Sequence, residues 1–351
     1  MHESTPLVSI GRILLAAMMF VLVLPYHPKA VDNRDWSQAT PSEIHAEMGR
    51  RKAMALEAAR RREALISSAV QANTQTNYDV TFYDIYLRLN DTTQMIYGRV
   101  GMTATATQDG VSAVDIDLYN NMPIDSIVSP SGPLTYSRAG NVVTVNLDHP
   151  YNTGESFSFV TYYNGHPVTG GFQAFSFDVH SGNTVMSSLS EPYLARTWWP
   201  CKDRPDDKAD SFHIAIEVAT QFYCGSNGTL DSTVATSPNT HTFYYTVHYP
   251  MTTYLFSVAA SVYTVWQQDY VYNGGLDTMP VVHATYPDMY SYALPRWGKT
   301  PDYIASLAKY YGEYPFTSEK YGHSNFEWGG GMEHQTMTSM TGSTFGFAEP
   351  V

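Results

Sequence analysis

Between Tyr78 and about Tyr263, the sequence alternates short runs of β-branched and aromatic residues with clusters of turn-forming residues. Turn signals such as Asp109-Gly110 and Asn227-Gly228 separate the runs. Regular short strands with such turns predict an antiparallel β-domain, either a sandwich or a saddle-like pair of sheets. The predicted strands are Val80–Leu89, Met95–Ala106, Val114–Leu118, Val142–Leu147, Ser156–Tyr163, His213–Val218, Thr242–Tyr249 and Tyr254–Val262.

The residues after Tyr263 follow a mixed pattern. Met279–Thr285 is predicted to be a strand, and Asp288–Trp297 and Asp302–Tyr311 are predicted to be helices. A chain of 351 residues is long enough for roughly two domains. The pattern stops at Val351 without a closing strand or a helix cap. We therefore expect residues 264–351 to be the truncated beginning of a second domain.

The first 30 residues have the features of a secretory signal peptide. An apolar run, Ile13–Leu24, follows Arg12 and ends before Pro25, and it is too short to span a bilayer comfortably. Pro28-Lys29-Ala30 is a poor match to the A-x-A cleavage signal, so an uncleaved N-terminal anchor is the alternative. Either interpretation exports the rest of the chain, which favours a secreted or periplasmic protein.

Residues 31–77 are expected to form a helical leader followed by a linker. The stretch from Pro41 to Ala69 has an intermittent apolar face, with Ser42 as its candidate N-cap. Its two basic runs are interleaved with glutamates, which favours a solvated helix face over a nucleic-acid-binding one. Gln71–Asn77 is a polar linker.

The charge distribution argues against a nucleic-acid partner. Residues 1–62 hold nine basic and six acidic residues, a net charge of +3, whereas residues 63–351 hold 11 basic and 27 acidic residues, a net charge of −16. An acidic body lacks the electrostatic footprint of a nucleic-acid-binding protein and suits a small or cationic ligand. Beyond the N-terminal run, no segment is apolar for 18 residues, so no integral membrane association is expected.

Two segments combine residues that could bind a ligand. The first is Ser190–Ala209, which concentrates Trp, Pro, Arg and carboxylates around Glu191. The second is Phe326–Met337, in which three glycines precede Met332 and Glu333. Glycines allow a ligand backbone to approach closely and to pair with a strand edge, and a carboxylate at the end of that edge can hold a cation.

These two segments resemble the M1 family of zinc metallopeptidases, the aminopeptidase N relatives. Gly330–His334 resembles the family's G-x-M-E-N exopeptidase motif, and Glu191–Ala209 resembles the signature E-P-x-x-A-R-x-[WF]-[WF]-P-C-x-D-x-P-x-x-K-A. Tyr249–Leu255 is similar to the strand that closes the family's N-terminal domain. The resemblance covers roughly Tyr78 to Val351. It implies a saddle-like antiparallel β-domain at residues 78–263, followed by the incomplete start of an α+β thermolysin-like catalytic domain.

The resemblance implies roles for five residues in binding a peptide substrate. Glu333 and Glu191 would recognise the α-ammonium group, and the edge formed by Gly330, Gly331 and Met332 would pair with the substrate backbone. Two positions depart from the family pattern. The family usually has Asn where this chain has His334, and often Gln where this chain has Leu189, a side chain that cannot make a polar contact to the substrate.

The family uses zinc, but the H-E-x-x-H zinc motif is absent from these 351 residues. Two histidines at i and i+4 are needed to put both imidazoles on one helix face. The zinc ligands and the general base are therefore expected beyond the C-terminus, and no catalytic or metal-binding residue is expected within the chain. His323 and His334 are interpreted as loop histidines rather than ligands.

Cys201 and Cys224 are the only cysteines. In an exported chain such a pair can form a disulfide. The alternative is two free thiols, because Cys201 belongs to the family signature in proteins without a partner cysteine. Trp198-Trp199 is expected to be core or interface packing, and Arg196, Asp203 and Lys208 are expected to form a structural ion network.

The sequence therefore predicts the N-terminal part of a secreted zinc aminopeptidase that removes N-terminal residues from peptides, with this chain alone inactive. The expected partner is a peptide with a free N-terminus. The alternatives are a non-catalytic peptide-binding module that lacks the zinc site and a secreted β-rich interaction domain.

Overall fold

A computed structural model describes residues 75–168 and 174–341, together with Thr40, Ser42, Glu43, Ala46, Gly49, Arg50 and Ala53. These residues belong to one compact unit, residues 37–351. The expected signal peptide, or uncleaved anchor, and most of the helical leader lie outside the described residues. Among the helices that are described, none is both long and apolar enough to cross a membrane.

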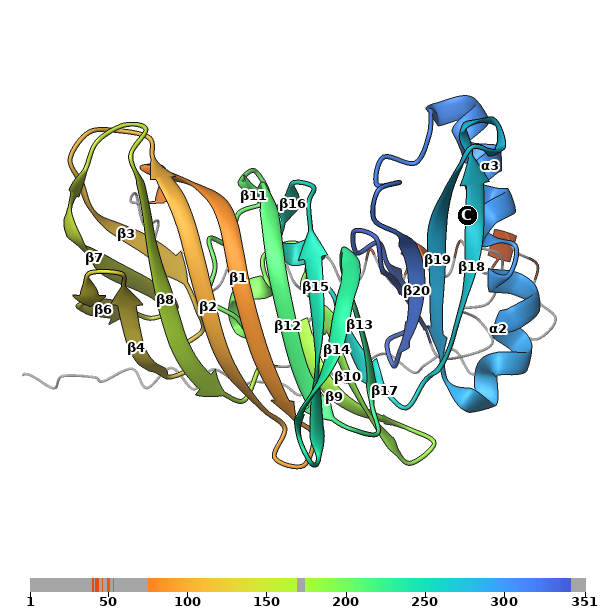
Figure 1. Cartoon of the computed structure of the whole chain (residues 1–351). Coiled ribbons are helices and arrows are strands. Elements are labelled where there is room, and N and C mark those ends of the chain that lie inside the picture. The colour runs from red at the N-terminus through yellow and green to blue at the C-terminus, as the bar shows by residue number, and fades with distance from the viewer. Residues whose placement is uncertain are drawn as a thin grey trace, which may run out of the picture. The chain divides into compact units, whose positions relative to one another are not determined.

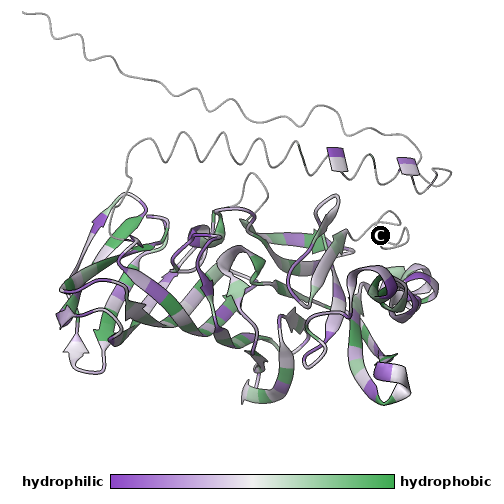
Figure 2. Ribbon diagram, turned by 90° about the horizontal axis from the view of Figure 1, so that it is seen from above, coloured by the Kyte–Doolittle hydropathy of each residue, from purple (hydrophilic) through white to green (hydrophobic). Residues whose placement is uncertain are grey.

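An eight-stranded sheet is the largest element, with the strand order β14-β15-β12-β1-β2-β8-β4-β5 (Figure 1). Along β1, Ile85, Leu87 and Leu89 are buried and alternate with more exposed residues. Figure 2 shows hydrophobic and hydrophilic bands following one another along the long strands. The strands are β14 (Thr229–Ser237), β15 (Thr240–Val247), β12 (Ser211–Ala219), β1 (Tyr78–Asn90), β2 (Met95–Ala106), β8 (Ser156–Gly165), β4 (Ile124–Ser129) and β5 (Gly132–Pro133).

One central pair of this sheet departs from the predicted antiparallel pattern. β1 and β12 run parallel, with Ile85 opposite Ile214 and Leu87 opposite Ile216. Parallel neighbours need a long connection, and here the chain forms β2 to β11 before it returns. The other pairs in the sheet are antiparallel, so the prediction of a mainly β, mainly antiparallel fold is confirmed.

Three smaller sheets share one apolar core with the large sheet. Trp198 and Trp199 lie fully buried in this core, as the sequence predicted, and Phe256 packs against both rings. The first sheet contains β13 (Tyr223–Ser226), β17 (Val258–Ser261), β10 (Asn183–Leu189) and β9 (Ala174–His180). The others contain β3 (Val111–Asp117), β7 (Val142–Tyr151) and β6 (Tyr136–Ala139), and β11 (Lys208–Ala209) with β16 (Met251–Thr252).

A separate five-stranded sheet begins directly after Tyr263, with the order β18-β19-β20-β22-β21. The predicted strand at Met279–Thr285 lies within β19, and the two predicted helices are confirmed as α2 and α3. Helix α3 packs against β18 (Figure 1). The elements are β18 (Thr264–Tyr272), β19 (Asp277–Thr285), β20 (Tyr321–Phe326), β21 (Gly331–Met332), β22 (Thr338–Thr341), α2 (Tyr290–Trp297) and α3 (Thr300–Tyr311). Short 3₁₀ turns are η3 (Ala195–Thr197), η4 (Thr253–Leu255), η5 (Asn273–Gly275) and η6 (Pro287–Met289).

The described part of the leader corrects the predicted helix start. Ser42 is already helical, and Thr40 is the residue that caps the helix. The backbone N of Glu43 donates to Thr40 Oγ1 at 3.3 Å, and the backbone N of Thr40 donates to Glu43 Oε2 at 2.9 Å. This reciprocal pair is a capping box, which satisfies two backbone donors that would otherwise lack partners.

The two cysteines are free, buried thiols, so the possible disulfide is not formed. Cys201 pairs through its backbone with Asp117 of β3, whereas Cys224 lies on β13 opposite Ala260 of β17. The two thiols are therefore held in different parts of the sheet framework. Burial raises the pKa of both thiols, which keeps them protonated and unreactive.

Candidate functional site

The glycine-rich segment forms the edge of the five-stranded sheet. Gly331 and Met332 form β21, which pairs antiparallel with β22, and the backbone N of Thr341 donates to the carbonyl oxygen of Gly330 at 2.9 Å. Because β21 is last in the strand order, its outer edge has no strand partner within the described ranges. An unpaired edge is the structure to which an extended peptide can add a strand.

Gly330 has a conformation that requires glycine. Its φ angle is +143°, and a side chain there would bring its Cβ to 2.6 Å from the Trp328 ring. The close packing of Trp328 over Gly330 therefore fixes the path of the chain immediately before β21.

Glu333 follows β21 directly and is exposed, whereas the neighbouring Met332 is fully buried. The carboxylate is therefore presented to solvent at the end of the unpaired edge. His334, in the family's Asn position, is buried, and its Nδ1 lies 3.0 Å from Ser339 Oγ.

Glu191 lies in the loop that follows β10, one residue after Ser190. The side chain of Glu191 is half-buried, and the next residues are fixed by hydrogen bonds to Ser190, from the indole of Trp198 at 2.9 Å and from the backbone N of Leu194 at 2.9 Å. Further along, Arg196 pairs with Asp203 at 2.8 Å.

The predicted structural ion network is confirmed for Arg196 and Asp203, and Arg196 also contacts Asp117 at 3.2 Å. Burial raises the pKa of Asp203, against the opposing effect of the Arg196 guanidinium. The prediction for Lys208 is wrong, because Lys208 is exposed on β11. Lys202 is instead the buried lysine of this segment, and it pairs with Asp207.

The two candidate segments meet through apolar contacts. Leu189 and Leu194 lie on either side of Glu191 in the sequence, and both share one buried cluster with Met332, the residue before Glu333. Phe326 and Ala174 complete the cluster. Leu189, at the family's Gln position, is 2% exposed and therefore serves as packing rather than as a polar contact.

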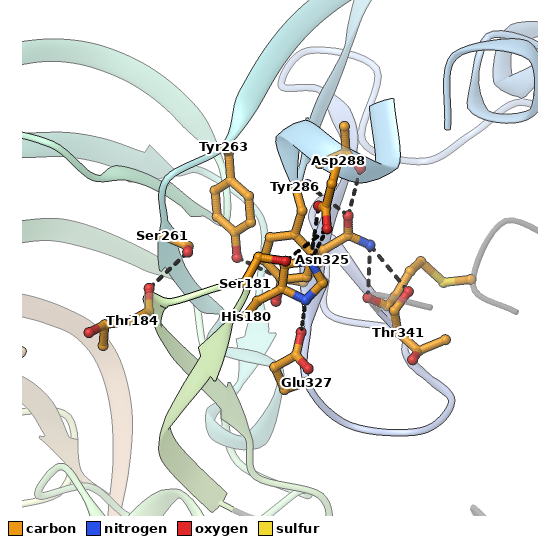
Figure 3. Close-up of polar contacts among 12 residues, drawn as sticks. His180, Ser181, Thr184, Ser261, Tyr263, Tyr286, Asp288, Asn325, Glu327 and Thr341 are labelled. Carbon is orange, nitrogen blue, oxygen red and sulfur yellow. Dashed lines mark hydrogen bonds and ion pairs between the residues drawn. The ribbon is translucent and has the colours of Figure 1, made fainter. Parts of the chain in front are cut away.

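A polar network that the sequence did not reveal joins β9 to the five-stranded sheet that contains β20 and β21 (Figure 3). His180, at the end of β9, lies between two carboxylates: Nδ1 is 2.9 Å from Glu327 Oε1, and Nε2 is 3.0 Å from Asp288 Oδ1. The imidazole also stacks on the ring of Tyr286, with centroids 3.7 Å apart. Ser181 Oγ donates to Asp288 Oδ2 at 2.9 Å.

Asn325 connects this network to both sides of the glycine-rich segment (Figure 3). Its backbone oxygen accepts from the hydroxyl of Tyr263 at 2.6 Å, and its Oδ1 accepts from Thr285 Oγ1 at 2.7 Å. Its Nδ2 donates to the carbonyl oxygens of Met340 and Thr341. Asn325 thus ties the end of β20 to β22, the pairing partner of β21.

The residues that follow Glu333 are also held against the β-domain framework. Asn227 Nδ2 donates to the carbonyl oxygen of Gln335 at 2.5 Å, and the backbone N of Gly228 donates to Thr336 Oγ1 at 2.8 Å. Buried Lys320 donates from Nζ to the carbonyl oxygen of Ser226 at 2.7 Å. Burial lowers the pKa of Lys320 to about 7, against the opposing effect of Glu319.

Sequence reasoning missed these contacts because their partners are far apart in the chain. His180 and Glu327 are separated by 147 positions, and Asn227 and Gln335 by 108. The local signals were two turns, Ser181-Gly182 beside His180 and Asn227-Gly228, and neither indicates a distant partner. Glu327 lies inside the segment that was singled out, but no local pattern assigned it a partner.

Comparison with known proteins defines the family. Residues 79–255 match the model of the peptidase M1 N-terminal domain, which covers just over half of the chain. The chain therefore belongs to the M1 peptidase family. No curated protein matches the chain.

Solved M1 zinc metallopeptidases have the same fold. A variant from Deinococcus radiodurans bound to a Tyr-Ser-Ala substrate is 20% identical, with a TM-score of 0.67, and the match covers 77% of this chain and 61% of that one. The enzyme without that substitution is 21% identical, with a TM-score of 0.66 and coverages of 76% and 60%. A two-domain M1 variant bound to L-tryptophan is 21% identical, with a TM-score of 0.67 and coverages of 77% and 62%. The chain thus spans about three fifths of the length of these relatives.

Zinc does not fit the donors available in the described ranges. No three His, Cys, Asp or Glu side chains there are grouped so that they could hold a metal ion. His283 and His323 are neighbours, with their Nδ1 atoms 3.2 Å apart, but both are fully buried beside Trp297. Burial lowers the pKa of His283 to about 3, so this pair remains neutral packing within the sheet.

Proposed function

We propose that this chain forms the substrate-binding part of a zinc aminopeptidase, in which Glu333 and Glu191 bind the α-ammonium group of a peptide. The observation that carries the proposal is the exposed Glu333 carboxylate at the end of β21, an edge strand without an outer partner among the described residues. A peptide paired with that edge would bring its first residues toward Glu333.

The geometry supports a preference for free N-termini. A free amine is cationic near neutral pH, and an internal amide is not, so a carboxylate pair distinguishes the two. The shared packing of Leu189, Leu194 and Met332 supports a common site for both glutamates. The D. radiodurans relative that was crystallised with Tyr-Ser-Ala is consistent with a peptide as the ligand class.

The catalytic chemistry belongs to another part of the proposed enzyme. Zinc ligands and a general base would come from outside these 351 residues, so this chain is expected to bind peptides without cleaving them. We also propose that residues 78–263 form a β-domain and that residues 264–351 form the first part of a catalytic domain. We further propose that the N-terminal segment exports the protein.

Calorimetric titration of the chain with a tripeptide and with its N-acetylated form tests the proposal. The free peptide should bind, and acetylation should weaken binding about ten- to hundredfold, which is the effect of losing a charge-assisted hydrogen bond. Glu333→Gln and Glu191→Gln should each reduce this preference. Glu313→Gln, which changes an exposed glutamate bonded to Tyr270, is the matched control and should leave it unchanged. Equal affinity for both peptides would exclude amine recognition.

A further inference from the structure

The hydrogen bonds that His180 can make depend on the number of protons on its ring. Both ring nitrogens face carboxylate oxygens, Glu327 on the Nδ1 side and Asp288 on the Nε2 side (Figure 3). A neutral imidazole carries one N–H and can donate to only one of the two carboxylates, because its other nitrogen presents a lone pair. The imidazolium has two N–H groups, so only the charged ring satisfies both contacts.

The titratable groups around His180 include two tyrosines and the carboxylates of Asp288 and Asp178. Burial raises the pKa of Tyr286 and of Tyr263, so both hydroxyls stay protonated. Burial also raises the pKa of Asp288, but hydrogen bonds from His180 and Ser181 outweigh it and hold that pKa below its ordinary value. The remaining neighbouring carboxylate, Asp178 on β9, accepts from Ser176 Oγ at 2.6 Å.

His180 is placed so that it acts on the glycine-rich segment through Glu327. Its side chain is 14% exposed, and that of Glu327 is 28% exposed, so water weakens their pairing only in part. Glu327 is the first residue after β20 and immediately precedes Trp328, whose ring packs over Gly330. Loss of the bridge would free the start of the segment that ends in β21 and Glu333.

We infer that His180 is a positioning residue for the amine-binding site: its imidazolium bridges Glu327 and Asp288 and thereby holds the glycine-rich edge in place. The edge should loosen wherever the ring is neutral, because one of the two carboxylates then faces a lone pair. Only the consequence for peptide binding rests on the proposed function.

Hydrogen exchange of the full chain at pH 6 and pH 8 tests the inference without any ligand. After correction for intrinsic exchange rates, the amides of residues 328–333 should be protected about tenfold less at pH 8 than at pH 6. His180→Gln should show the lower protection at both pH values. Burial lowers the pKa of Lys320 to about 7, so Lys320 contributes its own pH dependence, and the comparison with His180→Gln isolates the effect of His180.

Two further variants separate the bridge from general destabilisation. Glu327→Gln supplies an amide N–H that can donate to the neutral ring, so the contact should persist at both pH values and remove the pH dependence. Ser181→Ala removes a neutral contact to the same Asp288 carboxylate and should retain the pH dependence. Equal protection at both pH values in the unmodified chain, unchanged by His180→Gln, would overturn the inference.

Peptide titration supplies the second readout. The affinity of the unmodified chain for a free tripeptide, divided by that of His180→Gln, should be about tenfold at pH 6 and near one at pH 8. The ratio cancels the titration of the peptide's own amine. A constant ratio across this range would contradict positioning by His180. Absence of peptide binding at both pH values would contradict the proposed function, while the exchange experiment would still decide the role of His180.

Discussion

Glu327 and Glu333 lie six positions apart and have different environments. Glu327 is paired with the imidazole of His180 and is only partly exposed, whereas Glu333 is exposed at the end of an unpaired strand edge. The Glu327 carboxylate, bonded to His180, helps to position the backbone, whereas the exposed Glu333 carboxylate is accessible to a cation from solution. The two glutamates are therefore expected to respond differently to substitution.

A double-mutant cycle tests whether Glu333 and Glu191 act on the same ligand group. Glu333→Ala should weaken binding of a free tripeptide about ten- to hundredfold, with Glu333→Gln in between, because the amide keeps an acceptor but not the charge. If Glu191 shares the ammonium, the double variant should lose less than the sum of the two single losses, by about 0.5–3 kcal/mol. Additive losses measured by calorimetry would show that the two carboxylates act independently.

Gly330→Ala should destabilise the glycine-rich segment. The substitution combines an unfavourable φ of +143° with a Cβ placed 2.6 Å from the Trp328 ring. The expected cost is about 1–3 kcal/mol, measured by chemical denaturation.

Gly274→Ala is the matched control for this effect. Its φ is also positive, at +67°, but no atom lies within 4 Å of the added Cβ. It should therefore cost less than Gly330→Ala, and an equal cost would show that contact with Trp328 does not matter.

Among the elements, strand length and burial determine what the sequence could predict. β1 and β2 are long and alternate clearly between buried and more exposed residues, so both were predicted close to their observed bounds. β14 was missed because residues 230–237 are all exposed and leave no apolar alternation to detect. β10 was missed because it is short and its last five residues are buried without alternation.

The candidate site was predictable only in its contiguous parts. The segments around Glu191 and Glu333 were found because each is a run of unusual residues, and the roles assigned to them came from the family resemblance. Their packing through Leu189, Leu194 and Met332, and the bridge at His180, depend on contacts between distant segments that no local pattern encodes.

Buried Lys320, the residue before β20, bonds to the end of β13 and should give the stability of the chain a distinctive pH dependence. The pKa of Lys320 is lowered to about 7 in the folded chain, whereas an unfolded lysine titrates near 10.4. Between these values the unfolded state binds more protons, so the contribution of Lys320 to stability rises with pH above about 7.

Denaturation at pH 7 and pH 9 measures this contribution. The stability of the unmodified chain relative to Lys320→Met should increase by about 2 kcal/mol over that range. Lys208→Met, which changes an exposed lysine on β11, is the control and should show no such increase. If the stability difference between the unmodified chain and Lys320→Met is the same at pH 7 and pH 9, the lysine is protonated in the folded chain throughout this range.

At the scale of the whole molecule, the main apolar core is confined to one part of the chain. Every buried member of that cluster lies between Tyr78 and Ala260, and the partly buried residues packed against it end at Val262. The five-stranded sheet, which starts at Thr264, contributes its own smaller clusters, one of them formed with β18, β19 and α3. This distribution supports a domain boundary near Tyr263.

A fragment of residues 75–263 should therefore fold on its own. Calorimetry should show one cooperative unfolding transition, because the fragment retains its complete apolar core. It should be less stable than the full chain, since contacts such as Asn227 to Gln335 and Lys320 to Ser226 are lost. A fragment that unfolds without a cooperative transition would show that the boundary is misplaced.

A crystal structure of the chain with a bound tripeptide tests amine recognition at the edge of β21 most directly. The peptide should pair with the outer edge of Gly331–Met332, with its α-nitrogen about 2.7–2.9 Å from a carboxylate oxygen of Glu333 and with Glu191 on the same nitrogen. A peptide bound with its amine away from both glutamates, or an edge of β21 covered by another segment of this chain, would contradict the account.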